Sequence, residues 1–283
     1  MSTPAAQYLA LGESGRNAWW RYVLGITCIA AAWMFGGGYA YGLVLHLVPL
    51  GRVTEFVAIN VSILTLLAGV VLVVIVLHRR SWRTLVTPRP KLDWRRIAEG
   101  AGVWVVLAAA SALIEHLVYP GRYAWTLDLQ RWLPFVVAAL LLTPLQCAAE
   151  ELVFRGYVVQ ALGRLLRQPV ILAVLSAVIF TLPHLYNPEV AAYGLAIMAA
   201  NYFVMGLFLA SVALRDGRLE LAIGAHAGNN LLLALFINYA DSAFETESVL
   251  IADALDPRYS LVTLALSALL FHWWVFRRPA AQP

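Results

Sequence analysis

The sequence predicts an all-α protein, a polytopic membrane bundle of about eight transmembrane helices. Of its 283 residues, 61% are apolar and only 13% are charged, whereas a soluble domain has about 25% charged residues. The mean hydropathy is +0.75. Apolar runs of about 20 residues, the length that crosses a bilayer as a helix, recur along the whole chain.

Each expected helix is an apolar run between polar or basic residues. The first and fourth runs are longer than a bilayer needs, which favours tilt or kinks, and Pro134 and Pro144 are candidate kink points in the fourth. Because no internal repeat or second domain is evident, we expect one integral membrane domain over residues 1–283. The predicted helices are 20–48, 55–78, 99–119, 132–163, 169–186, 191–214, 219–240 and 259–276.

The Lys and Arg residues are distributed unevenly between the two sides of the predicted bundle. Most of the 20 fall on one side, seven of them in the loop 79–96. That loop suits an anionic lipid surface or is simply the largest cytoplasmic loop. By the positive-inside rule, both termini are expected in the cytoplasm. The cations of the other side, which also holds the acidic segment 241–256, are Arg52, Arg122, Arg131 and Arg258.

Composition also indicates the surroundings of the chain. The ten Trp and twelve Tyr fit the aromatic belts of a lipid bilayer, so no nucleic-acid partner is expected. The short loops are typical of a bacterial plasma (inner) membrane protein. Cys28 and Cys147 both fall within apolar segments and are expected to be buried thiols without a disulfide.

Few polar side chains lie within the predicted spans. A charge at the centre of a spanning helix costs roughly 2.5–3.5 kcal/mol, so such residues usually serve function. The weaker candidates are those near helix ends or those expected to pack between helices. The full set is His46, Glu115, His116, Glu150, Glu151, Arg155, His184, Asn201, His226, Asn229, Asn230 and His272.

The stretch around Glu150 concentrates three of these charges. Glu151 and Arg155 are four residues apart on one helix, so they are expected to pair. Glu150 points about 100° away around the helix and is left without a full partner. Such a carboxylate in a low-dielectric site suits a general base. We therefore expect Glu150 to carry chemistry and Glu151 with Arg155 to support the fold.

The next segment places Phe180 and His184 four apart on one helix face, with Pro183 before the histidine. The turn between the fourth and fifth helices centres near residue 167, so Glu150 and His184 are each about 17 residues from it. Equal distances from the turn of an antiparallel hairpin predict equal depth, and the two side chains are expected to face each other.

The third segment contains His226 and Asn230, also four apart, among small residues that allow close helix packing. Counted from Arg218, His226 lies shallower than Glu150, so this helix must tilt or break. Water activation fits the set: Glu150 takes the proton and His184 helps to hold the water. His226 and Asn230 then donate hydrogen bonds to the oxyanion formed on a substrate carbonyl.

Three motifs in this order carry a family resemblance. Glu-Glu-x-x-x-Arg (Glu150, Glu151, Arg155), Phe-x-x-x-His (Phe180, His184) and His-x-x-x-Asn (His226, Asn230) resemble the CPBP family of CAAX-protease and bacteriocin-processing enzymes. The resemblance covers about residues 130–240, the expected catalytic core. It implies an intramembrane endopeptidase that hydrolyses a bond near the C-terminus of a membrane-associated peptide or protein, which in some relatives is lipidated.

The resemblance leaves cofactor and mechanism open between a zinc metalloprotease and a metal-free glutamate protease. Glu150, His184 and His226 are possible zinc ligands, since a catalytic zinc takes three protein ligands and water. The sequence has no His-Glu-x-x-His helix, and we favour the metal-free form. A membrane transporter or proton relay that uses the same Glu and His residues is the alternative, with a haem site held by two histidines a further one.

Overall fold

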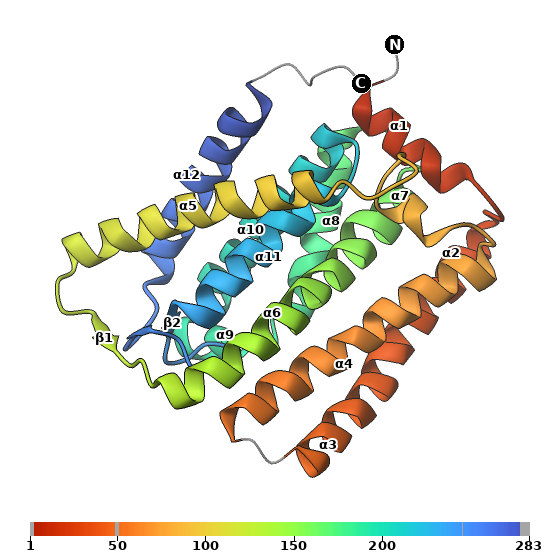
Figure 1. Cartoon of the computed structure of the whole chain (residues 1–283). Coiled ribbons are helices and arrows are strands. Elements are labelled where there is room, and N and C mark those ends of the chain that lie inside the picture. The colour runs from red at the N-terminus through yellow and green to blue at the C-terminus, as the bar shows by residue number, and fades with distance from the viewer. Residues whose placement is uncertain (1–2, 49–50, 245, 278–283) are drawn as a thin grey trace.

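The computed structural model describes residues 3–48, 51–244 and 246–277 and shows a bundle of long helices (Figure 1), which confirms the all-α prediction. Three of the long segments contain a π-helical stretch. The long segments are α2 (Trp19–Ala31), continuing through π-helical Ala32–Gly37 into α3 (Gly38–Leu47); α4 (Arg52–Leu72), ending in π-helical Val73–Leu77; α5 (Trp94–Val118); α6 (Leu129–Glu151), continuing through π-helical Leu152–Val158 into α7 (Val159–Leu162); α8 (Pro169–His184); α10 (Leu195–Asp216); α11 (Glu220–Leu235); and α12 (Pro257–Phe276).

Short elements lie at the two ends of the bundle. At one end are α1 (Pro4–Ala10) and the 3₁₀ turns Leu11–Glu13 and Trp82–Leu85; at the other are α9 (Pro188–Tyr193) and a three-stranded sheet. In the sheet, β3 (Leu250–Ala252) pairs antiparallel with β1 (Tyr123–Trp125) and parallel with β2 (Ile237–Tyr239). Strands this short carry no periodic signal, and the sequence did not predict them. We call this end of the bundle the sheet end.

Six of the helical segments are long and apolar enough to cross a membrane. Helices α8 and α11, also predicted as spans, have 16 residues each and are about 24 Å long, shorter than the hydrocarbon core. The bundle fits an integral membrane protein. Its eight long segments correspond to the eight predicted runs.

Two predicted boundaries are wrong. The run 191–214 is divided between α9 and α10, because Gly194 has φ 99°, a conformation that ends a helix. The run 219–240 ends early, at Leu235, and its last residues form β2. Pro134 and Pro144 lie within α6, and the departure from α-helical geometry comes after them, at Leu152–Val158.

Helix α11 runs through the middle of the bundle and packs closely on α5 (Figure 1). A Cβ placed on Gly224 would lie 2.0 Å from the carbonyl oxygen of Ile97, and one on Gly100 would lie 2.3 Å from that of Leu221. Only glycine permits this approach of two backbones. The small residues around His226 therefore allow the close helix packing that the sequence predicts, and α11 is a continuous helix.

The basic loop folds against the end of the bundle opposite the sheet. Arg96 binds Asp216 at 2.7 Å, and Asp93 accepts a 3.0 Å hydrogen bond from Arg218. Arg80 is buried and donates to the carbonyl of Leu11. These contacts account for several of the arginines that follow α4. We call this the basic end.

The expectation of two buried thiols holds for Cys147 only. Both cysteines are free, but Cys28 is exposed on α2. Apolar sequence does not distinguish a side chain buried in protein from one that faces lipid, and α2 turns much of its surface outward.

Candidate active site

A buried ionic cluster joins α6, its π-helical continuation and α11. The Oε1 atom of Glu151 accepts a 2.8 Å hydrogen bond from Nη1 of Arg155 and another of 2.8 Å from Nδ1 of His226. Glu151 and Arg155 are fully buried. The predicted Glu151–Arg155 pair is therefore present, and His226 completes it from a helix distant in sequence.

Arg155 is held on two further sides. Its Nη2 donates to the carbonyl of Gly206 on α10 at 3.2 Å, and its guanidinium lies 4.2 Å from the ring centroid of Phe180 on α8. A desolvated cation over an aromatic face gains about 2 kcal/mol. Phe180 thus supports the cluster, and one guanidinium fixes the relative positions of three helices.

Glu150 diverges from Glu151 around the helix, as its angular position predicts, and approaches this cluster at His226. Its Oε1 accepts a hydrogen bond from Gln146, one helical turn earlier, and its Oε2 lies 3.8 Å from Nε2 of His226. No cation other than His226 pairs with it among the described residues. One carboxylate is thus neutralised by arginine, and its neighbour keeps an oxygen available.

His184 is oriented by its own helix. Its Nδ1 lies 2.8 Å from the carbonyl oxygen of Phe180. A carbonyl accepts only, so Nδ1 carries the proton and Nε2 is an acceptor in the neutral ring. The ring packs between those of Phe180 and Tyr202, with centroids 4.4 and 4.9 Å away.

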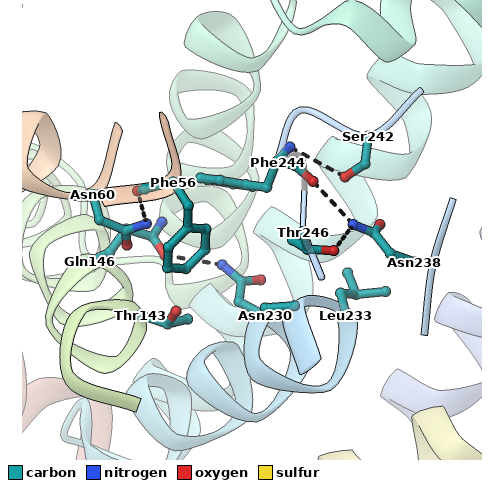
Figure 2. Close-up of a pocket in the computed structure, with 11 residues that line it drawn as sticks. Phe56, Asn60, Thr143, Gln146, Asn230, Leu233, Asn238, Ser242, Phe244 and Thr246 are labelled. Atoms are coloured by element: carbon teal, nitrogen blue, oxygen red, sulfur yellow. Dashed lines mark hydrogen bonds between the residues drawn. The ribbon is translucent and has the colours of Figure 1, made fainter. Parts of the chain in front are cut away.

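Asn230 reaches the site through Gln146. Its Nδ2 donates to Oε1 of Gln146 at 3.2 Å (Figure 2). Gln146 also donates to Glu150, so it bridges Glu150 and Asn230. Behind it, Asn229 donates to Oδ1 of Asn230 at 3.1 Å and accepts a 3.0 Å bond from Trp104. Asn229 is thus a supporting residue, and Asn230 is held in a fixed orientation.

The four predicted catalytic residues line one cavity of about 650 Å³. Glu150, His184, His226 and Asn230 come from three different helices and meet at its inner part. A concave site with a few convergent polar groups in apolar walls is typical of ligand binding. The matched depth predicted for Glu150 and His184 agrees with this shared cavity.

The cavity extends from these residues toward the sheet end. Its outer lining includes Tyr239 of β2, Ala252 of β3 and Glu189 of α9. None of its described lining residues belongs to the segments 78–93, 163–168 or 217–219 at the basic end. The site is therefore reached from the end of the bundle that is poor in Lys and Arg.

A second, small cavity of about 40 Å³ adjoins Gln146 and Asn230 (Figure 2). Three buried polar atoms without a hydrogen-bond partner belong to residues that line it: Oδ1 of Asn60, Oγ1 of Thr143 and Oδ1 of Asn238. A cavity of this size holds one or a few water molecules, and such atoms are their usual partners. Gln146 therefore borders both cavities.

A metal does not fit the arrangement of the described residues. No group of three or more His, Cys, Asp or Glu side chains among them has the geometry to hold an ion. Nδ1 of His226 is bound to Glu151 and Nδ1 of His184 faces the Phe180 carbonyl, which leaves Nε2 as the free nitrogen of each ring. As they are placed, the side chains proposed as zinc ligands line a common cavity without forming a coordination site.

Three residues of the site were missed. Gln146 stands four residues before Glu150, a spacing that could have indicated a hydrogen bond along one helix. Tyr202 and Glu189 also line the cavity, but they reach it only because the chain breaks at Gly194, which no spacing revealed.

The remaining candidates lie away from the reacting groups or support packing. Glu115 binds Arg122 at 3.2 Å. His272 faces Ser211 at 2.8 Å, so it packs between α12 and α10. Asn201 accepts from Ser260 and donates to the Pro257 carbonyl. Buried Cys147 contacts Gln146, and His46 and His116 are exposed.

Comparison with known proteins shows which family the site is similar to. Residues 129–232 match the family model described as "Type II CAAX prenyl endopeptidase Rce1-like", and all seven motif residues fall within that range. The chain is 29% identical over 245 residues to the uncharacterized protein YyaK of Bacillus subtilis (strain 168), with 81% of this chain and 82% of YyaK covered. No solved structure matches. Residues 129–232, which contain the site, are thus similar to the Rce1-like type II CAAX prenyl endopeptidases.

Proposed function

We propose that the protein is an intramembrane endopeptidase that hydrolyses a peptide bond near the C-terminus of a membrane-associated or lipidated protein. One observation carries the proposal. Glu150 keeps an oxygen free beside the cavity it shares with His184, while the adjacent Glu151 is neutralised by Arg155 and His226. A structural ion pair would need only one of these two carboxylates.

Water activation assigns one task to each side chain. A water molecule donates one proton toward Glu150 and the other toward Nε2 of His184, whose Nδ1 is engaged with the Phe180 carbonyl. Glu150 accepts the proton as the oxygen attacks the scissile carbonyl carbon. Glu150 then passes this proton to the leaving amine, so one water is consumed and one acid and one amine are formed.

The negative charge that develops on the carbonyl oxygen is met by His226 and Asn230. Since Nδ1 of His226 donates to Glu151 at 2.8 Å, the ring can donate from Nε2 as well only when it carries both protons. Nε2–H then becomes a donor, and the amide of Asn230 supplies a second. One such donor contributes about 10²–10³ in rate.

We infer a glutamate-protease mechanism without a metal, because each of the four groups has a role that its hydrogen bonds already define. We also infer a bacterial inner membrane, with both termini in the cytoplasm, from the cations gathered at the basic end. In this orientation the cavity extends toward the outer side, so that substrate enters from that side or from the adjoining lipid.

The test is cleavage by the full-length chain, purified in detergent, of quenched reporter peptides with and without a prenylated cysteine. Metal content is measured on the same preparation, and each reaction is repeated with a chelator. Cleavage that persists without metal supports the proposal. Stoichiometric zinc with chelator-sensitive cleavage would replace the glutamate mechanism by a metal one. Proton-coupled solute uptake in vesicles, with no cleavage, would favour a transporter.

A further inference from the structure

Apart from His226 of the catalytic group, the charges of the large cavity have one sign. The other charged side chains among its described lining residues are all carboxylates, and no Lys or Arg lines it: Glu115, Glu150, Glu189 and Asp256. A free C-terminal carboxylate is recognised in proteins by Arg, by Lys or by clustered backbone N–H groups. His226 is already engaged with Glu151, and no other described lining residue supplies a cationic side chain that would bind one.

Three of these carboxylates already have a role, two of them in the structure and one in the proposed function. Glu115 is neutralised by Arg122 at 3.2 Å. Asp256 caps α12 by accepting from the backbone N–H groups of Arg258 and Tyr259. Glu150 is the proposed base. Glu189 is the remaining carboxylate, and it has neither a cation nor a reaction step.

Glu189 is 3% exposed and is held in place by neutral donors. Its Oε1 accepts from the backbone N–H of Ala243 at 2.7 Å and from the hydroxyl of Tyr239 at 3.0 Å. Its Oε2 has one long contact, 3.4 Å from the hydroxyl of Tyr202. No Lys, Arg or His among the described residues forms an ion pair with it, and a buried charge without a counter-charge is costly.

The position of Glu189 connects it with the reacting groups. Tyr202 contacts Glu189 through its hydroxyl and packs its ring 4.9 Å from that of His184. A cation at Oε2 of Glu189 would therefore lie one tyrosine side chain away from the histidine that holds the water. Glu189 lies in the first turn of α9, where a carboxylate is stabilising, and it also lines the cavity.

We propose that the cavity selects a peptide with a cationic side chain, Lys or Arg, which pairs with Glu189, and that it does not bind a free C-terminal carboxylate. The inference rests on the proposed function only in taking a peptide as the ligand. It narrows the substrate to a peptide segment with a positive charge near the scissile bond. If that peptide has a free terminal carboxylate, the carboxylate stays outside the cavity.

Binding tests this separately from catalysis. The full-length Glu150→Gln chain in detergent is titrated into fluorescent peptides that are apolar and have an amidated C-terminus. Each peptide carries Lys, Gln or Glu at one position, and a series of peptides places this residue at successive positions. We expect Lys to bind about tenfold more tightly than Gln at its best position, with Glu weakest. In the double variant that also carries Glu189→Gln, the side chain keeps an acceptor oxygen but loses its charge. The difference in affinity between the Lys and Gln peptides should then disappear. Adding Asp241→Asn, at a carboxylate that binds Tyr193 at 2.9 Å outside the cavity, should retain it.

Each other outcome overturns the inference. These are equal affinity for Lys and Glu peptides, a Lys preference that survives Glu189→Gln, tighter binding of the free acid than of the amide, and binding of no peptide. Cleavage by the wild-type chain is scored separately. A Lys preference that depends on Glu189, without cleavage, would contradict the proposed function alone. Cleavage without this preference would contradict this inference alone.

Discussion

Glu151 on α6 accepts a 2.8 Å hydrogen bond from His226 on α11, 75 residues later in the chain. The same oxygen accepts from Arg155. The contact therefore does two things: it helps to neutralise a buried carboxylate, and it turns the other nitrogen of His226 toward Glu150. The stability of the bundle and the geometry of the site are thereby coupled.

Removing the cation from this cluster is expected to destabilise the fold. Arg155→Met leaves Glu151 buried with only His226 as a partner, and breaking a buried pair costs about 3–5 kcal/mol. The folded fraction, measured by size-exclusion chromatography in detergent, should fall sharply. Arg167→Met, at a side chain that is 85% exposed, is the control. Equal folded yields for the two variants would contradict a stabilising role for the pair.

Gln146 is expected to matter for rate rather than for folding. Gln146→Leu keeps the shape of α6 but releases both Glu150 and Asn230, and a misplacement of about 1 Å costs on the order of 10² in rate. The fall should appear in kcat, with KM little changed. Gln130→Leu, on the exposed start of the same helix, serves as the comparison, and an equal effect of both substitutions would argue against the bridge.

The α5–α11 contact depends on glycine. Gly224→Ala puts a methyl group 2.0 Å from the Ile97 carbonyl, so the helices must separate, at about 1–3 kcal/mol. The apparent Tm in detergent should fall, and activity with it, since His226 follows two residues later. Gly102→Ala on α5 has no atom within 4 Å of the new Cβ and should be neutral. An unchanged Tm for Gly224→Ala would mean that the helices do not meet here.

Stability is expected to fall in mild acid through His78, which directly follows the span that ends at Leu77. Burial, together with the nearby Arg80, Arg21 and Arg164, lowers the pKa of His78 below its usual 6.5, although the Arg16 carbonyl opposes the shift. The unfolded chain therefore binds more protons below pH 6.5, and stability declines from there through the folded pKa. The Tm should fall more steeply with pH in the wild type than in His78→Gln; parallel curves would contradict this.

Much of the site could be predicted because its residues stand a few positions apart on single helices. Glu151 and Arg155 pair across one helical turn, and Glu150 diverges from them because of the helical angle. Glu189 and Tyr202 could not be found in this way. Their approach depends on the positive φ of Gly194, which breaks one expected helix into two, and on strands too short to show a pattern.

The sequence also could not show which helix faces are exposed and which are buried in protein. Apolar residues that face lipid and apolar residues that face protein look alike, so Cys28 was expected to be buried and is exposed. In the same way, the run around α11 reads as a spanning helix, although most of its residues are enclosed by protein. The central position of α11 follows from close glycine contacts with α5, which a single sequence does not reveal.

The most direct test of the account is the turnover of Glu150→Gln on a reporter peptide that the wild type cleaves. Glutamine can keep the contact with Gln146 but cannot accept a proton from water, and general-base catalysis contributes about 10²–10⁴ in rate. The account predicts a loss of at least about 10²-fold in kcat, with the elution profile and Tm of the folded protein retained. Wild-type turnover by a folded Glu150→Gln protein would contradict the assignment of Glu150 as the base.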